Sequence, residues 1–195
     1  MMKQLILIFA AIVSLQQVNA QVLSTRTAHI SVESGNNIQD IEADNYQAVC
    51  QLNTETGQFK MQALLKSFEF KIGAINRLLN TRKLDVTQNP KIKFDGKVTN
   101  IEQVNFAKPG KYEVEVLGTL YIWDEQRKTK YNATLTVNEN GSVQGLSAFP
   151  ITIEEMNVDK INDIMRQKLP AVLAIDVDRL GISRNINIEA EMLLQ

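Results

Sequence analysis

The sequence predicts an all-β domain of antiparallel strands, arranged as a sandwich or as a closed barrel. Three observations support this class. Apolar and polar residues alternate with a period of two along most of the chain. Clusters of Gly, Asn and Pro separate these segments, as turns do. Helical spacing of apolar residues occurs in only two short stretches. Periodicity alone does not separate a sandwich from a barrel, so both remain open at this point.

The first twenty residues have the pattern of a secretory signal peptide. Lys3 supplies a positive start, residues 5–15 form an apolar run, and Val18-Asn19-Ala20 is a small-x-small cleavage site. A membrane span needs about 20 apolar residues, and no run in this chain is that long. The sequence therefore predicts a mature domain of residues 21–195, no transmembrane segment, and a periplasmic or secreted location.

The first part of the mature chain predicts a hairpin that ends in a break. The residues expected on one face of its first strand are Tyr46, Ala48, Cys50 and Leu52. Residues 53–57 are typical of a hairpin loop, and the alternation then predicts a strand over 59–65. The parity of the apolar residues changes at Lys66-Ser67, which predicts either a bulge or the end of the strand.

The remaining strands follow the same alternation. They are predicted at residues 92–98, 112–123, 131–137, 143–153, 172–177 and 186–192. The strand at 112–123 has Gly118 near its centre, where we expect a bend. Its second half is apolar on both faces, which predicts that a helix or the opposite wall covers one end of it.

Two segments predict short amphipathic helices. In the first, Ile75, Leu78 and Leu79 recur at helical spacing before Asp85. The second follows Asp159, a suitable N-cap, and ends at Pro170. Its apolar residues are Ile161, Ile164, Met165 and Leu169.

Composition and motifs exclude several functions. The chain has 21 Lys and Arg against 22 Asp and Glu, with no basic block, so it lacks the charge that nucleic-acid binding requires. His29 is the only histidine and Cys50 the only cysteine, which leaves too few ligands for a transition-metal site. No nucleophile motif is present, and His29 is best explained as a surface or capping residue. We therefore expect neither catalysis nor a cofactor.

The stretch from Leu65 to Val98 carries a recognisable pattern. A Phe-bearing strand at 66–71 precedes a short helix at 75–80, and residues 84–94 then contain an Asp-Val, a Pro and an apolar-x-Phe. This pattern resembles the YceI-like family. Weaker similarity occurs at residues 30–32, 118–123 and 149–151. The resemblance implies an eight-stranded antiparallel barrel similar to lipocalins, with one or two short helices.

In that family the barrel holds a polyisoprenoid lipid or an isoprenoid quinone in an elongated apolar cavity, and the resemblance implies such a ligand here. Two departures concern the cavity. The His that short members often carry in the helix is absent from residues 75–80, and Val32 stands where many members have an aromatic residue. Both departures predict a less polar and less aromatic interior.

By this resemblance, the residues expected to line the cavity are Phe68, Phe70, Leu78, Leu79, Phe94, Val116, Leu120 and Ile122. The protein would then sequester or carry a polyisoprenoid or another long-chain amphiphile, as a monomer or homodimer. The alternative is that the same residues form an ordinary filled core. In that case the barrel would act through its surface as an interaction module.

Overall fold

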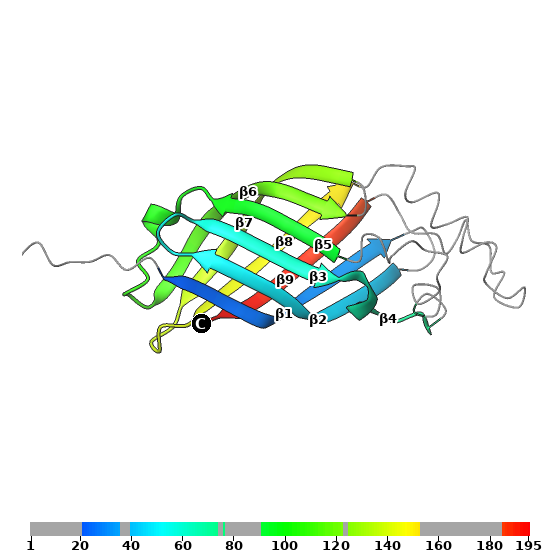
Figure 1. The fold of residues 1–195 in the computed structure, drawn as a ribbon, viewed down its shortest axis with the longest axis horizontal. Coiled ribbons are helices and arrows are strands. Elements are labelled where there is room, and N and C mark those ends of the chain that lie inside the picture. The colour runs from blue at the N-terminus through cyan, green and yellow to red at the C-terminus, as the bar shows by residue number, and fades with distance from the viewer. Residues whose placement is uncertain (1–20, 36–39, 74–75, 77–90, 123–124, 153–184) are drawn as a thin grey trace, which may run out of the picture.

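The computed structural model describes residues 21–35, 40–73, 76, 91–122, 125–152 and 185–195. Its strands form one antiparallel sheet that closes into an eight-stranded barrel (Figure 1). The barrel strands are β1 (Val22–Gly35), β2 (Asp40–Asn53), β3 (Gln58–Leu64), β5 (Lys91–Val98), β6 (Gly110–Ile122), β7 (Glu125–Val137), β8 (Val143–Thr152) and β9 (Asn185–Leu194). The structure thus confirms the all-β class and decides for the barrel.

The order of strands around the barrel is β1, β9, β8, β7, β6, β5, β3 and β2, and β2 pairs again with β1. This last pairing closes the ring, so the sheet keeps no long unpaired edge. A short strand, β4 (Glu69–Phe70), pairs with β2 at Ala43 and Asp44, beyond the end of β3.

The two ends of the barrel differ. At one end, which we call the hairpin end, lie the 53–57 loop, the turn at residues 138–142 and both Gln21 and Gln195. Gln195 exchanges backbone hydrogen bonds with Ser24 there. At the opposite end, which we call the far end, β6 stops at Ile122 and β8 at Thr152.

The structure corrects the predicted face of β2. Ala48, Cys50 and Leu52 are buried inside the barrel, but Tyr46 points outward and is 56% exposed. The register between β1 and β2 shifts on both sides of the Ala28–Ala48 pair, so β2 bulges at residues 46–47 and its inward parity passes to Asn45. The prediction for Tyr46 was wrong because the bulge reverses the alternation.

The break predicted after the 59–65 strand is the end of that strand. β3 stops at Leu64, and a single 3-10 turn, η1 (Leu65–Ser67), follows before β4. The other 3-10 turn in the described chain, η2 (Ile101–Gln103), precedes β6. The strand predicted at 172–177, the helix after Asp159, and the 75–80 helix apart from Asn76 lie outside the described residues.

Two further predictions need correction. β7 begins at Glu125, six residues before the predicted start at 131. The prediction missed these residues because 125–130 are polar on both faces and show no apolar alternation. The cover expected over the second half of the 112–123 strand is absent at Leu117, whose side chain lies on the outer face and is 49% exposed.

Candidate functional site

All six predicted lining residues that the structure describes belong to the core or pack against it; Phe94, Val116, Leu120 and Ile122 are on barrel strands, whereas Phe68 follows η1 and Phe70 is in β4. Four of them are buried in the core: Phe68, Phe94, Val116 and Leu120. Phe70 and Ile122 are partly buried and pack against the same core. Leu78 and Leu79 lie outside the described residues. The sequence therefore located an interior surface, on which Phe94 of β5 lies directly across from Leu120 of β6.

A layer of four aromatic side chains crosses the middle of this interior. Phe59 and Phe94 have ring centroids 5.9 Å apart, and Phe94 and Tyr131 are 5.7 Å apart, with the rings tilted in both pairs. Tyr131 and Phe149 are stacked at 4.1 Å. We call these four residues the aromatic layer. They come from β3, β5, β7 and β8, so the layer extends along one side of the barrel.

Two glycines make room for the central ring of this layer. Gly96 of β5 and Gly118 of β6 pair across the two strands. A Cβ atom at Gly118 would lie 2.4 Å from Cζ of Phe94, and one at Gly96 would lie 2.6 Å from its Cε1. The ring of Phe94 thus lies against bare backbone. Gly118 therefore allows close packing of the Phe94 ring. The sequence analysis predicted a bend at Gly118 and did not foresee this packing.

Tyr131 takes part in both a tilted and a stacked pair of the layer. Its strand, β7, lies opposite β2 in the ring of strands. Burial is the main cause that raises the pKa of Tyr131, and the nearby Cys50 thiol of β2 raises it further. Tyr131 is the central residue of β7 (Glu125–Val137), so the aromatic layer marks a boundary between two halves of the described interior.

The half toward the hairpin end is closely packed. It has an apolar cavity of only about 30 Å³, next to Phe59 and Tyr131 and bounded by residues such as Val116, Leu135 and Leu194. That volume holds about one or two water molecules, far less than a lipid chain needs. We call the other half, toward the far end, the far half. Its wall includes Val32, Ile41, Ile92, Leu120, Ile122, Ile151, Ile186 and Ile188.

The far half also contains polar side chains that the sequence analysis missed. The register between β6 and β7 is continuous, so Arg127 and Thr129 share the inward face of β7 with Tyr131. Arg127 lies across from Leu120, and Thr129 lies across from Gly118. The sequence analysis expected a less polar interior and did not predict these two polar residues. The signal that could have found them is parity, since both lie an even number of residues before Tyr131.

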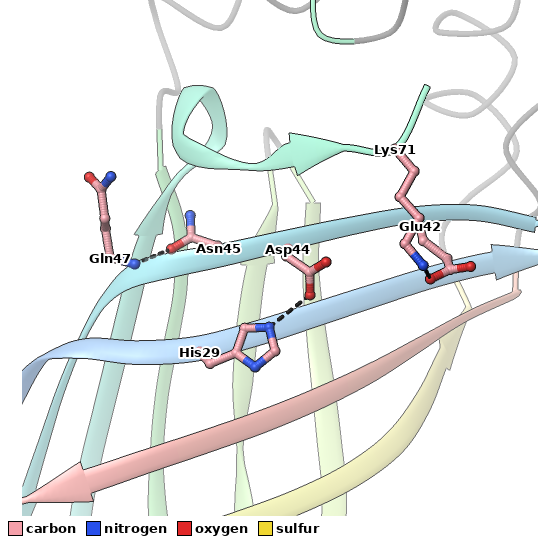
Figure 2. Close-up of polar contacts among 6 residues, drawn as sticks. All are labelled: His29, Glu42, Asp44, Asn45, Gln47 and Lys71. Carbon is pink, nitrogen blue, oxygen red and sulfur yellow. Dashed lines mark hydrogen bonds and ion pairs between the residues drawn. The ribbon is translucent and has the colours of Figure 1, made fainter. Parts of the chain in front are cut away.

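Polar contacts also bind β1 to β2 on the outer surface (Figure 2). Nε2 of His29 and Oδ1 of Asp44 lie 2.7 Å apart, and the His29 ring stacks on Tyr46 with centroids 4.4 Å apart. Farther along β2, Lys71 forms an ion pair with Glu42. His29 therefore lies outside the barrel in a structural contact. Within the described part of the chain, no group of three or more His, Cys, Asp or Glu side chains is placed to hold a metal ion.

A second hollow lies on the outer face, over β1, β9, β8, β7 and β6. It encloses about 540 Å³ and is open to solvent. Its lining residues include His29, Glu113, Asn132, Ala148, Glu189 and Glu191. Apart from this hollow, the outer surface exposes scattered large apolar side chains such as Leu117 and Leu193. No helix in the described ranges is long and apolar enough to span a bilayer.

Comparison with known proteins gives a family and a fold. The sequence profile of the YceI-like domain matches residues 15–192. A polyisoprenoid binding domain from Saccharophagus degradans, implicated in plant cell wall breakdown, has a similar structure with a TM-score of 0.72 and 10% sequence identity, over 91% of this chain and 99% of that chain. BcnA from Burkholderia cenocepacia has a TM-score of 0.55 and 13% identity, over 86% of this chain and 96% of its own. No curated protein matches the sequence significantly.

Proposed function

The chain belongs to the YceI-like family, and we propose that it is an exported binding protein that holds an amphiphilic isoprenoid lipid or quinone in its barrel. The observation that carries this proposal is the apolar inner wall of the far half. The structural neighbour from Saccharophagus degradans is described as a polyisoprenoid binding domain. At 10% identity that likeness shows the shared fold, so the ligand is part of the proposal.

The physical basis is burial of a slender apolar chain. An eight-stranded barrel is just wide enough for its own side chains or for one narrow ligand. Each methylene that moves from water onto an apolar wall contributes about 0.8 kcal/mol. A polyprenyl chain lying along isoleucine and leucine side chains such as Leu120, Ile151 and Ile188 would thus be held without specific chemistry.

Export is the second part of the proposal. Its support is the signal-peptide pattern that ends at Ala20. Because β1 begins at Val22, cleavage after Ala20 would leave every described strand intact. N-terminal sequencing of the exported protein should give Gln21 as the first residue, and an intact Met1 or a purely cytosolic pool would contradict export.

We propose binding without catalysis. The only imidazole, that of His29, contacts Asp44 and Tyr46 on the outer surface. The only thiol, that of Cys50, is buried, and burial raises its pKa to about 12, so it remains protonated at neutral pH. Neither group therefore has the exposure and activation of a catalytic nucleophile or base.

Native mass spectrometry of the protein purified from its own host tests the function directly. The expected result is a bound species whose mass, after organic extraction, is that of a long-chain isoprenoid or quinone. The same spectra give the oligomeric state, for which we expect a monomer or homodimer. Protein that retains no lipid in several preparations would contradict the carrier function.

One observation favours a second function. The aromatic layer and the closely packed hairpin-end half fill a large part of the interior. A barrel filled throughout would act through its surface, where the hollow over β7, β8 and β9 is a candidate docking feature. The extraction experiment separates the two functions, since an interaction module carries no lipid.

A further inference from the structure

We propose that the outer face of β3, β5, β6 and β7 is a docking surface for a membrane that contains anionic lipids. We call it the lysine face and define it by five exposed lysines, Lys60, Lys93, Lys97, Lys128 and Lys130, with the outward side chains between them. The proposal goes beyond lipid binding in the barrel, because it concerns the outer surface and does not depend on what the interior holds.

The register of the four strands brings these lysines onto one surface. The middle row across the strands runs from Lys60 of β3 to Lys128 of β7, and Lys97 and Lys130 occupy the next row. Lys93 lies in the row on the other side. Neighbouring positions on such a face are about 5 to 7 Å apart, which is less than the screening length of about 8 Å at physiological salt. The charges therefore act together on an approaching surface.

Most of this positive charge has no ion-pair partner. Lys130 pairs with Glu115 at 2.6 Å, and the other four lysines of the face form no ion pair within the described residues. The carboxylate that lies among them is that of Asp95, across from Lys60, and it forms no ion pair with any described residue either. The lysine face therefore retains a net positive charge.

The two sides of the barrel carry opposite charge. β3, β5, β6 and β7 contain eight Lys and Arg, of which Arg127 faces inward, against four Asp and Glu. β1, β2, β8 and β9 complete the ring, and they contain six Asp and Glu against Arg26 alone. The formal net charge of the chain is only -1, so its composition conceals this separation. Opposite charge on two sides orients a protein near a charged surface.

The residue types on the lysine face favour a lipid surface over an acidic protein. All its cations are Lys, which is depleted in protein–protein interfaces, whereas Arg is enriched there. Leu117, which is 49% exposed, and the partly exposed Tyr121 lie on the same face. Exposed apolar and aromatic side chains beside a basic cluster add apolar contact to the attraction toward anionic lipids.

The lysine face also reaches the far end of the barrel. Tyr121 is one residue from the end of β6 at Ile122. At the same end, the exposed side chain of Leu64 closes β3 and pairs with Lys91 at the start of β5. Docking on this face would therefore bring the far end of the barrel next to the bilayer.

Vesicle sedimentation tests the docking. Purified exported protein would be mixed with vesicles of phosphatidylcholine alone, with vesicles that also contain phosphatidylglycerol, and with soluble polyglutamate at the same concentration of charge. We expect binding to the anionic vesicles to be at least about tenfold tighter than to the neutral vesicles or to polyglutamate, and to weaken at high salt.

Two double variants assign the binding to the lysine face. Lys93→Gln with Lys97→Gln should weaken binding to anionic vesicles about tenfold or more, because each lysine near such a surface contributes about fivefold. Arg26→Gln with Lys108→Gln is the matched control. It removes the same charge from exposed positions on β1 and in the turn before β6, outside the lysine face, and should bind as the wild type does.

Two labelled variants report which side meets the bilayer. Leu117→Cys and Leu193→Cys place a thiol on the lysine face and on the acidic side, at positions that are 49% and 48% exposed. The natural Cys50 is buried, with its pKa raised to about 12, so a polarity-sensitive thiol dye would label the new position. With anionic vesicles, the emission at position 117 should shift to shorter wavelength while that at 193 stays unchanged.

Each outcome decides the matter. Equal binding to anionic and neutral vesicles, or binding to neither, would overturn the docking surface, whereas the lipid inside the barrel is judged separately by native mass spectrometry. Equal losses in the two double variants, or equal shifts of the two labels, would overturn it as well. Binding to polyglutamate as tight as to anionic vesicles would assign the face to an acidic protein instead. Should the Lys93 and Lys97 variant fail to fold, the vesicle comparison and the two labels still decide.

Discussion

Asn45 is a buried polar residue that holds the bulge of β2 in place. Its Oδ1 accepts a hydrogen bond from the backbone N–H of Gln47 at 2.9 Å (Figure 2), and its Nδ2 donates to Oγ of Ser67 at 2.6 Å. The side chain thus ties the bulge to η1, where β3 has ended. This arrangement satisfies a backbone donor that the bulge would otherwise leave without a strand partner.

Replacing Asn45 with Ala should destabilise the barrel by about 2 kcal/mol, because the buried groups around it lose their hydrogen bonds. Urea denaturation would measure the change in the free energy of unfolding. Gln47→Ala is the matched control: its side chain is exposed, and its backbone N–H keeps the bond to Asn45. The control should change stability by less than about 0.5 kcal/mol. Equal effects of the two variants would contradict this role.

Cys50 and Tyr131 should lower the stability of the barrel at alkaline pH. Burial raises the pKa of the Cys50 thiol from 9.0 to about 12 and also raises that of the Tyr131 phenol. The unfolded chain therefore loses these protons at lower pH than the folded chain. The free energy of unfolding should fall above about pH 9, by up to about 1.4 kcal/mol per pH unit for each group ionised only in the unfolded chain.

The measurement is the decrease of Tm between about pH 8 and pH 10. A Cys50→Ala, Tyr131→Phe double variant has neither titrating group, so its Tm should decrease less over this range than that of the wild type. The comparison is between the two slopes, because the substitutions also change stability at every pH. If the slopes are equal, these two groups do not cause the alkaline loss.

At the scale of the strand, β5 and β6 depend on their paired glycines. A Cβ at Gly118 would lie 2.4 Å from Phe94 Cζ and 2.7 Å from the carbonyl oxygen of Asp95, so both a core ring and the backbone would have to move. Overpacking of this kind costs about 1 to 3 kcal/mol, and occasionally more. Gly118 is therefore required for the approach of the two strands to the Phe94 ring.

Gly118→Ala should lower the free energy of unfolding by at least about 2 kcal/mol. Gly110→Ala provides a control on the same strand, because a Cβ there meets nothing nearer than 3.7 Å, on the ring of Tyr112. Thermal denaturation of the two variants would show the difference. A Gly118→Ala protein as stable as the Gly110→Ala protein would contradict this prediction, because the ring of Phe94 could then adopt another position without loss of stability.

The sequence predicted strand positions correctly where one face of a strand is buried and the other is exposed to solvent. β3, β5 and β9 alternate in this way, and their predicted positions agree with the structure to within a few residues. It failed at residues 125–130, where both faces of the strand are polar. It also failed at Tyr46, because a bulge that the sequence does not reveal turns this residue outward. The alternation of apolar residues along β2 does not reveal a register shift, because the pairing of β2 with β1 determines that shift.

The candidate site was predicted only in part. The six described residues of the predicted lining belong to the core or pack against it, because apolar alternation marks an interior surface, and their contact with a ligand stays a prediction. The aromatic layer was not found, since its members come from β3, β5, β7 and β8, and only the closed ring brings them together. Arg127 was missed for a different reason: a charge in a polar run is normally assigned to solvent.

At the scale of the whole molecule, the aromatic layer gives the two halves of the barrel different tolerance for added volume. Leu120 of β6 belongs to the far half, and Val116 lies on the same inward face, beside the cavity of about 30 Å³ in the hairpin-end half. If the far half holds a lipid chain, extra volume at Leu120 displaces the chain. Extra volume at Val116 would instead press on the close-packed side chains of the core.

Leu120→Trp should therefore abolish lipid retention at little cost in stability, whereas Val116→Trp should destabilise the barrel by about 3 kcal/mol without acting on the lipid directly. Organic extraction of each purified variant measures retained lipid, and urea denaturation measures stability. The contrast between two inward positions four residues apart on one strand separates ligand space from core. A Leu120→Trp protein destabilised as much as Val116→Trp, from a wild type whose extract contains no lipid, would identify the barrel as filled throughout and leave its outer surface as the functional part.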